Sequence, residues 1–510
     1  MIVHLMYPDR DFDPKQALPK NSNELIQDLE LGTIFDAMAK KDEFLYAVAK
    51  TAILSSLTNY DQIRYRNAVL QDCIKNPQIV RDLYQIPIEA GILKRKRWLG
   101  LFTHSPTGVL SSAVEMMSMF VDLLRKLNRI AIDHSEKFDS EGFKTFFEWI
   151  KTELDEEYIQ TVEYHLKQLR FKNGNLFSAK LGKGNEIDEL ILRMPNRKNW
   201  FENIVSKVSP GYTFRIAERD DAGMRILGDL KNLGLNAVAN ALAQSADNVD
   251  IFLDTLRQEL AFYIGCLNLL ENLQASGNSY CFYSEEPADD FSHSAAGLYD
   301  VGLALVMKQK ITGNELAAVR KQLFVITGAN QGGKSTFLRS IGVAQMMLQS
   351  GMFLPASSFS ANLCTNVFTH YRRKEDSSMK SGKLDDELAR MSKIIDQIQP
   401  GSLMLFNESF AATNENEGSI IAKQIVDALL DTKIKVFFVT HMFEFANACF
   451  ESYNDNGVFL RAERKTGGKR TFKLTVGEPL PTSFGKDVYK TVFFPQKVHP
   501  EPEKTVITEE

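Results

Sequence analysis

The chain has 510 residues, of which 44% are hydrophobic and 25% charged, and a formal net charge of −5. At roughly 150 residues per domain, this length predicts about three domains of an ordinary globular protein and excludes a wholly disordered chain. A protein built only to coat nucleic acid is also excluded, because there is no basic excess; any contact with DNA must come from local patches.

The cysteines and the N-terminus exclude several other classes. Five cysteines are scattered without a Cys-x-x-Cys pair, which argues against a disulfide framework and against a zinc site. The first ten residues lack the charged start and long apolar core of a signal peptide. No stretch approaches ~20 uninterrupted apolar residues, so we expect no transmembrane helix and a cytoplasmic location.

The first half of the chain has the periodicity of helices. Between residues 24 and 135 apolar side chains recur at three- and four-residue steps, most clearly from Ala113 onward. A second long helix is predicted over 248–273, again with one apolar stripe. Helices with single stripes are typical of bundles or levers.

A different pattern separates these two helical stretches. The turn signal at 172–175 is followed by short runs at 176–181, 190–194 and 211–215, each of which is a candidate strand. We therefore expect a small mixed insertion over residues 150–220.

The last part of the chain alternates strands with helices. A polar stretch at 275–295 predicts a boundary loop, and almost wholly apolar runs follow at 323–327, 403–406 and 436–440. Such runs are typical of strands buried on both faces of a parallel sheet, with the intervening helices as crossover connections. The tail from Pro495 onward, rich in proline and glutamate, predicts disorder.

A glycine-rich loop follows the first of these strands. The segment Gly328-x-x-x-x-Gly333-Lys334-Ser335 matches the Walker A pattern, in which backbone N–H groups surround phosphates. Lys334 is predicted to neutralise the β- and γ-phosphates of ATP, and Ser335 to ligate Mg²⁺. The predicted nucleotide-binding residues of this loop are Gly328, Asn330, Gly332, Gly333, Lys334, Ser335 and Thr336.

Two further strand ends carry groups suited to hydrolysis. Asn407 and Glu408 follow the run at 403–406, where a Walker B acidic pair is expected, and Glu408 is predicted to polarise the attacking water. Asn407 stands in place of the metal-side aspartate; it can bind a metal-held water but supplies no charge, which predicts weaker Mg²⁺ affinity or slower turnover. His441 follows the run at 436–440 and is predicted to sense the γ-phosphate or to orient the water.

These residues carry a resemblance to a known family. Several segments are similar to the loop, strand, Walker B, D-loop and histidine regions of the MutS mismatch-repair ATPases. The segments are 328–339, 349–356, 367–370, Glu408, 414–418 and 440–444. The resemblance is specific over about 320–450 and extends in a weaker form over most of 25–320.

The resemblance implies a fold and a division of the chain. The fold is an α/β P-loop (ABC-type) ATPase domain at the C-terminus, preceded by a mainly α-helical core and lever domain with a small mixed insertion. The implied parts are an N-terminal segment 1–24, helical core and lever parts 25–149 and 221–290, a shortened clamp-like insertion 150–220, the ATPase domain 291–494 and a disordered tail 495–510.

The resemblance also implies a dimer in which each ATP site receives a signature loop from the other subunit. Here that loop is the segment 381–388, and Glu387 matches the glutamate of the family's loop. Gly382 and Lys383 stand where the family has a serine–threonine pair. Ser381 is adjacent and is the predicted substitute, with Lys383 as an alternative contact to the γ-phosphate. A solvated charged loop is the other interpretation of this segment.

DNA, mismatched or branched, is the partner that the resemblance implies. Full mismatch-repair members begin with a recognition domain that carries a wedge phenylalanine, whereas only a few dozen residues precede the core-like helices here. Direct reading of mismatches is therefore not expected. Basic residues suited to DNA phosphates are Lys167, Arg170, Lys172, Lys180 and Lys183, with a second patch at 94–98. A solvated surface is the alternative for each patch.

Two hypotheses of function follow. The leading one is a DNA-associated, MutS-like dimeric ATPase, a homodimer or heterodimer that clamps DNA when ATP binds and makes no membrane contact. The alternative is a nucleotide-switched interaction subunit with little turnover that dimerises with another MutS-like protein, because Asn407 and the altered signature loop favour slow hydrolysis. Another ABC-type ATPase, such as a chromosome-maintenance protein, is disfavoured by the absence of long coiled-coil heptads.

Overall fold

The chain is described by a computed structural model in nine stretches. They are residues 2–98, 105–171, 174–193, 214–283, 286–287, 289–329, 331–373, 382–464 and 470–481. The chain forms two compact units, Met1–Pro14 with Ala68–Ile264 and Lys15–Asn67 with Gly265–Glu510. Two of the three boundaries fall within helices α4 (Tyr60–Lys75) and α10 (Asp221–Ala275), and the third, between Pro14 and Lys15, precedes the first helix.

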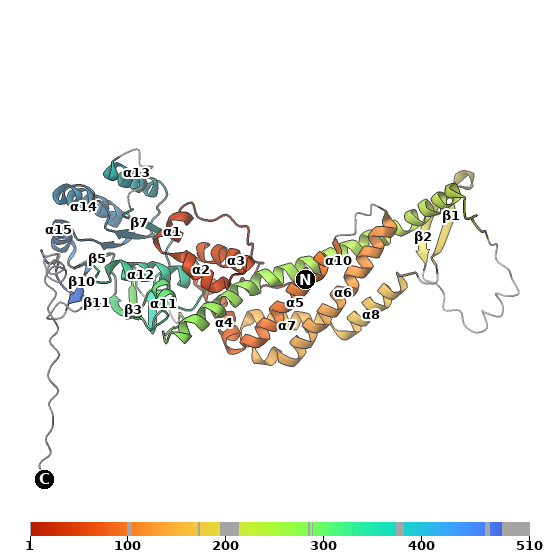
Figure 1. Ribbon diagram of the computed structural model, residues 1–510, viewed down its shortest axis with the longest axis horizontal. Coiled ribbons are helices and arrows are strands. Elements are labelled where there is room, and N and C mark those ends of the chain that lie inside the picture. The colour runs from red at the N-terminus through yellow and green to blue at the C-terminus, as the bar shows by residue number, and fades with distance from the viewer. Residues whose placement is uncertain are drawn as a thin grey trace, which may run out of the picture. The chain divides into compact units, whose positions relative to one another are not determined.

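The first unit is built mainly from helices (Figure 1). They are α5 (Pro77–Trp98), α6 (Pro106–His134), η1 (Ser135–Lys137), α7 (Glu141–Glu153), α8 (Glu156–Gln168) and most of α10. Helix α6 begins where Ser105 accepts a hydrogen bond from Gly108 N–H and Pro106 occupies the first turn. Its buried side chains run from Leu110 to Ala131 and face α5, α7 and α8, which confirms the predicted stripe.

Helix α6 is also the one helix of the described stretches that is long and apolar enough to cross a membrane. Its most apolar window is 44% buried within the protein. The packing of α6 against three neighbouring helices accounts for this composition, because the core helix of a bundle needs the same apolar stripe.

The predicted small insertion contains a two-stranded antiparallel hairpin. Strand β1 (Leu176–Leu181) has the predicted bounds, and β2 (Ile187–Arg193) begins three residues before the predicted start at 190. The hairpin packs on α10 at Gly234, where a Cβ atom would lie 2.5 Å from the Phe177 ring. The third predicted strand, at 211–215, lies largely outside the described residues, and its described residues 214 and 215 form no strand.

One buried carboxylate anchors the N-terminal segment to the first unit. Glu259 of α10 is fully buried, and its Oε2 atom accepts hydrogen bonds from Leu5 and Met6 N–H (2.5 and 3.1 Å). Its Oε1 atom accepts from Phe12 N–H (2.8 Å), and the Tyr263 hydroxyl donates to the Leu5 carbonyl (2.5 Å). Burial raises the pKa of Glu259 to about 7, against the opposing effect of these donors.

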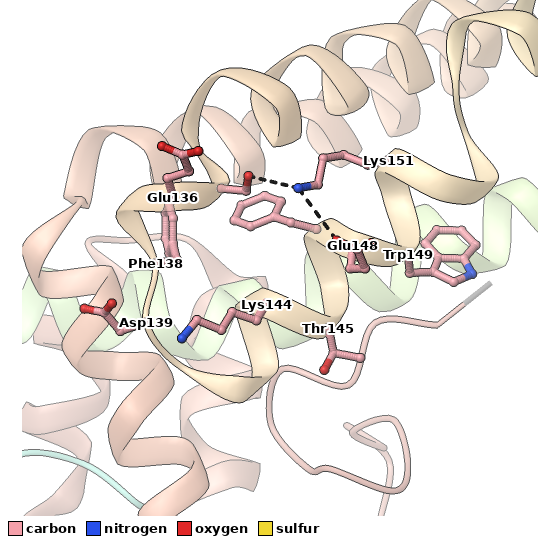
Figure 2. A pocket seen from close by; sticks show the side chains of 10 residues that line it. Glu136, Phe138, Asp139, Lys144, Thr145, Glu148, Trp149 and Lys151 are labelled. Atoms are coloured by element: carbon pink, nitrogen blue, oxygen red, sulfur yellow. Dashed lines mark hydrogen bonds and ion pairs between the residues drawn. The ribbon is translucent and has the colours of Figure 1, made fainter.

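The open hollow beside α7 that Figure 2 shows lies in an acidic part of the chain. Residues 133–163 hold ten aspartates and glutamates against three lysines. Within the hollow, Lys151 donates to the Ser135 hydroxyl (3.3 Å) and pairs with Glu148 (3.7 Å), as the dashed lines mark. The lysine is thus engaged locally, and the excess of carboxylates makes this surface unsuited to a phosphate backbone.

The second unit is a mixed α/β structure with two sheets (Figure 1). Its helices are α1 (Ser22–Asp28), α2 (Leu31–Ala39), α3 (Glu43–Leu54), α11 (Val301–Met307), α12 (Lys334–Leu348), α13 (Lys383–Ile395), α14 (Glu415–Asp431) and α15 (Phe443–Tyr453). Its strands are β3 (His293–Leu298), β4 (Asn314–Ala318), β5 (Leu323–Thr327), β6 (Ser358–Ala361), β7 (Val367–Tyr371), β8 (Leu403–Asn407), β9 (Lys435–Val439), β10 (Gly457–Arg464) and β11 (Arg470–Val476).

The larger sheet has the order β11-β10-β5-β9-β8-β7, and the smaller has the order β4-β3-β6. Strands β10, β5, β9, β8 and β7 are parallel, and only β11 runs antiparallel to its neighbour. The three predicted strands are β5, β8 and β9, which confirms the parallel sheet. Because parallel strands end at the same edge, the residues after β5, β8 and β9 meet there.

Helices cover both faces of the larger sheet, so its strands are buried on both sides. Side chains of α14 and α15 share a core with Phe406 and Phe438 on one face. On the other face α12 lies so close that a Cβ atom on Gly342 would be 2.7 Å from Leu405. The same Cβ atom would lie 2.6 Å from Leu29, which belongs to this unit together with the rest of residues 15–67.

The domain borders that the family resemblance implies remain predictions, since the compact units divide the chain differently.

Substitution of Glu259 by leucine should release the N-terminal segment. Three buried N–H groups would lose their acceptor, and each unsatisfied group costs about 1–3 kcal/mol. Hydrogen exchange of residues 5–12 should therefore become faster, whereas the exposed control Glu153→Leu should leave it unchanged. Equal exchange in the two variants would contradict the anchoring role.

The same carboxylate should make stability depend on pH. Its pKa in the folded unit is above the unfolded value, so its contribution is fully present below about pH 4.5 and is lost as the pH rises through about 7. The urea midpoint of the first unit should fall over this window in the unsubstituted chain and fall less in Glu259→Leu.

Candidate nucleotide-binding site

The glycine-rich loop connects β5 to α12 in a backbone conformation that requires glycine. Gly328 and Gly333 have φ angles of +117° and +91°, in the region that disfavours other residues. A Cβ atom on Gly328 would lie 2.9 Å from Ala462 N, and one on Gly332 would lie 2.7 Å from Ala462 Cβ. Strand β10 thus packs against the loop so closely that glycines are needed at both positions.

Lys334 and Ser335 begin α12 directly after Gly333, and Thr336 follows in its first turn. The Lys334 Nζ atom donates to the carbonyls of Gly328 and Ala329 (2.7 and 3.2 Å). Burial lowers the pKa of Lys334, and the Glu408 carboxylate partly offsets this effect. Asn330 lies outside the described residues. The helix N-terminus and the lysine together form the arrangement that favours an anion.

The end of β8 lies beside this loop. The Ser335 hydroxyl donates to Asn407 Oδ1 (2.8 Å), so the two residues predicted to hold Mg²⁺ are in contact. Both offer oxygen atoms, the donor type that Mg²⁺ prefers, and both are uncharged. These residues fit a magnesium ion held partly through water, with its remaining ligands from phosphate oxygens.

Glu408 and His441 come together at the ends of β8 and β9. Glu408 N–H donates to the Val439 carbonyl (2.9 Å), and the Glu408 carboxylate lies 4.0 Å from His441 Nδ1. Both side chains are partly exposed, 28% for Glu408 and 38% for His441. The structure therefore brings the two predicted hydrolytic residues to the sheet edge that carries the loop, with solvent access to both.

The predicted signature segment is helical from Lys383 onward, and its described residues are exposed or half-buried apart from Glu387. Ser381 lies outside the described residues, and Gly382 precedes the first turn of α13. Glu387 is buried, and its carboxylate accepts a hydrogen bond from Phe410 N–H (2.7 Å) in the same chain. Burial raises the pKa of Glu387, with the Phe410 N–H opposing the shift. Its contact with a nucleotide stays a prediction.

Three residues beside the site were missed from the sequence. Ser409 and Phe410 follow Glu408, and His370 ends the buried part of β7. The His370 Nδ1 atom lies 2.8 Å from Ser409 Oγ, and Phe410 is fully buried next to the His370 ring. The available signal was a histidine at the end of an apolar strand, Val367 to His370, which on its own is more often structural.

A fourth missed residue contacts the glycine-rich loop from β11. Arg470 donates to the Gln331 side-chain oxygen (2.6 Å), and Gln331 itself has a positive φ of 63°. Strand β11 is therefore one of the elements that hold the loop. The sequence analysis did not predict the position of β11, because this strand pairs antiparallel with β10 at the edge of an otherwise parallel sheet.

The predicted basic patches lie in the first unit. Lys167 and Lys183 are exposed, whereas Lys180 pairs with Glu189 and Arg170 donates to Ser118 (3.4 Å). Lys172 lies outside the described residues. In the second patch, Lys94 forms an ion pair with Asp250 of α10, which ties it to the helical core.

Comparison with protein families gives two matches along the chain. The profile described as MutS2 N-terminal domain matches residues 58–276, and the profile described as MutS domain V matches residues 324–508. The first covers α4 to α10, and the second starts in β5 and includes the glycine-rich loop, α13 and the ends of β8 and β9.

Curated relatives match over shorter stretches. "Endonuclease MutS2" of Lacticaseibacillus casei is 30% identical over 36% of this chain and 23% of its own length. "DNA mismatch repair protein MutS" of Chlamydia abortus is 29% identical over 41% and 26%. "MutS protein homolog 4" of Mus musculus is 23% identical over 47% and 25%. The matched part of the chain thus spans about a quarter of the length of these relatives.

Replacing Asn407 by aspartate should strengthen binding of Mg²⁺ at this edge. The added carboxylate keeps an acceptor for the Ser335 hydroxyl and supplies the charge that asparagine lacks. We expect the Mg²⁺ concentration that half-saturates nucleotide binding to fall by about ten-fold, measured with a fluorescent ATP analogue. Asn366→Asp adds the same charge before β7, at the opposite edge of the sheet, and should change nothing. An equal effect of both variants would show that Asn407 does not face the metal.

Proposed function

The chain belongs to the MutS family, and on this premise we propose that it is a P-loop ATPase that binds DNA as a dimer. ATP with Mg²⁺ binds at the edge of the six-stranded sheet, and hydrolysis there resets the DNA-binding state. Mismatched or branched DNA is the proposed ligand. The partner in the dimer is a second copy or another MutS-like chain.

The observation that carries the proposal is the convergence of three strand ends on the glycine-rich loop. Ser335 contacts Asn407 at 2.8 Å, and the Glu408 carboxylate lies 4.0 Å from His441 Nδ1 and acts electrostatically on Lys334. A cation, a hydroxyl, a carboxylate and an imidazole at one edge are the groups that phosphoryl transfer to water requires.

Each group has a role that its geometry supports. The N-terminus of α12 and Lys334 hold the phosphates, and Ser335 with Asn407 holds Mg²⁺, which neutralises charge on the phosphates. The Glu408 carboxylate is exposed enough to accept a proton from the attacking water. His441, 4.0 Å from that carboxylate, orients the water or contacts the γ-phosphate.

A second candidate function is a nucleotide switch with little turnover. Asn407 favours it, because two neutral ligands attract Mg²⁺ less than a carboxylate does. In this case ATP would promote association with another MutS-like chain, and hydrolysis would be incidental. A steady-state rate near zero for the unsubstituted chain, with ATP binding intact, would select this candidate.

Substitution of Glu408 by glutamine should separate binding from hydrolysis. The amide cannot accept a proton from water, so we expect turnover to fall by about 100-fold or more, while ATP affinity stays within a few-fold. Phosphate release and binding of a fluorescent ATP analogue measure the two quantities.

The control for this experiment is Glu451→Gln, an exposed glutamate in α15, which should leave both quantities unchanged. Equal turnover of Glu408→Gln and the unsubstituted chain would remove Glu408 from the mechanism.

DNA binding is proposed for exposed lysines of the first unit. Lys167 at the end of α8 and Lys183 in the β1–β2 turn are exposed cations, and the surface around α7 is acidic. The double variant Lys167→Glu/Lys183→Glu should weaken binding to duplex and four-way-junction DNA by about ten-fold or more and reduce its salt dependence.

The matched control is Lys137→Glu/Lys144→Glu, which alters the net charge equally but on the acidic surface. Fluorescence anisotropy at several salt concentrations, with and without ATP, measures both variants. Equal weakening by both pairs would mean that net charge, and not this surface, governs binding.

A further inference from the structure

The segment that carries Glu408 has a strained backbone. Glu408 and Phe410 have φ angles of 54° and 63°, in the left-handed region that disfavours residues with a Cβ atom. In the glycine-rich loop at the same edge, Gly328 and Gly333 take up the positive φ angles. No glycine is present at 408–410, so surrounding contacts must hold this segment in place.

His370 supplies two of these contacts. The Ser409 hydroxyl lies 2.5 Å from the His370 carbonyl and 2.8 Å from its Nδ1 atom, and its single hydrogen can reach either. The Phe410 ring stacks on the imidazole, with ring centroids 5.2 Å apart and planes inclined by 15°. The side chain of Phe410 also enters the core below α14 and α15.

Helix α13 provides further hydrogen bonds that hold the segment after Glu408 in place. The His370 Nε2 atom donates to the Glu387 carbonyl (3.0 Å), and the Glu387 carboxylate accepts from Phe410 N–H (2.7 Å). Arg390, one turn later, donates to the Tyr371 carbonyl (3.2 Å). Helix α13 is thus hydrogen-bonded both to the end of β7 and to the segment after Glu408.

A second buried histidine of the same unit shows that burial alone does not require such contacts. His293 in β3 is also fully buried, among Phe324, Phe359 and Phe437, and neither of its ring nitrogens has a hydrogen-bond partner in the structure. His370, in contrast, has partners on both ring nitrogens and on its carbonyl. His370 is therefore held by specific hydrogen bonds that burial of a histidine does not by itself require.

We propose that His370 is a positioning residue for hydrolysis: through Ser409, Phe410 and Glu387 it holds the left-handed segment that aims the Glu408 carboxylate. The proposal rests on the proposed function and adds a residue to it. His370 touches neither nucleotide nor water in this account. It acts by fixing the backbone directly after Glu408, and misplacement of a catalytic carboxylate by about 1 Å is enough to slow a reaction about 100-fold.

The arrangement also connects two parts of the site. Movement of α13, the helix that contains residues 383–388 of the predicted signature segment, would displace the acceptors of Phe410 N–H and of the His370 Nε2 atom. A contact made by that segment with a neighbouring subunit would therefore reach Glu408 of the same chain. This route needs no change in the glycine-rich loop, so it would alter the rate of hydrolysis and leave nucleotide affinity unchanged.

The test uses His370→Phe, which keeps a stacking ring and removes both ring hydrogen bonds, and Ser409→Ala, which removes one hydroxyl without filling space. Hydrogen exchange of the peptide 406–411 should become about ten-fold faster in both variants, because a loosened segment lets Glu408 N–H and Phe410 N–H separate more often from the Val439 carbonyl and the Glu387 carboxylate. Turnover should fall by about 10- to 100-fold with ATP affinity unchanged.

His293→Phe is the matched control, since it makes the same change at a buried histidine without partners, and it should alter none of these quantities. Unchanged exchange in both test variants would overturn the proposal, as would faster exchange with normal turnover. If His370→Phe fails to fold, Ser409→Ala decides alone. Absence of turnover in the unsubstituted chain, together with faster exchange in the variants, would count against the proposed hydrolysis and not against the support of the segment.

Discussion

Parallel pairing of β5, β9, β8 and β7 is the constraint on which the rest of the second unit depends. It brings the residues after four separate strands to one edge, although they are spread over more than a hundred positions of the chain. Helices on both faces bury the strands, so the edge is the place where polar groups can meet both solvent and a ligand. Lys334, Glu408 and His441 are close together for this reason.

Two turns at that edge contain residues with positive φ angles, and the two turns are stabilised in different ways. The loop before α12 uses Gly328 and Gly333, which adopt positive φ angles without cost from a Cβ atom. The turn after β8 has side chains at these angles and relies on hydrogen bonds and stacking from His370 and Glu387. The first turn thus depends largely on its own glycines, with Arg470 of β11 supporting Gln331, whereas the position of Glu408 depends on neighbouring elements.

The sequence predicted those parts of the site that depend on residues close to one another along the chain. The apolar runs of β5, β8 and β9, the glycine pattern and the residues at the strand ends were all found, because burial on two faces and positive φ angles leave direct marks in a sequence. The contacts of Glu387 and His370 were not found, since they join residues up to 39 positions apart. Periodicity predicted α10 only over 248–273, whereas the family resemblance implied a helical part from 221. The first part of α10, from Asp221, exposes Met224, Ile226 and Leu233 and has no single apolar stripe to detect.

The central claim is that the sheet edge binds Mg²⁺-ATP at the loop 328–336. Isothermal titration of the intact chain with ATP, with and without Mg²⁺, tests it directly, with Lys334→Ala as the comparison. We expect one ATP per chain, with a dissociation constant between about 1 μM and 1 mM. Binding should be stronger with Mg²⁺ and absent in Lys334→Ala. Absence of binding at millimolar ATP, or equal binding by Lys334→Ala, would contradict it.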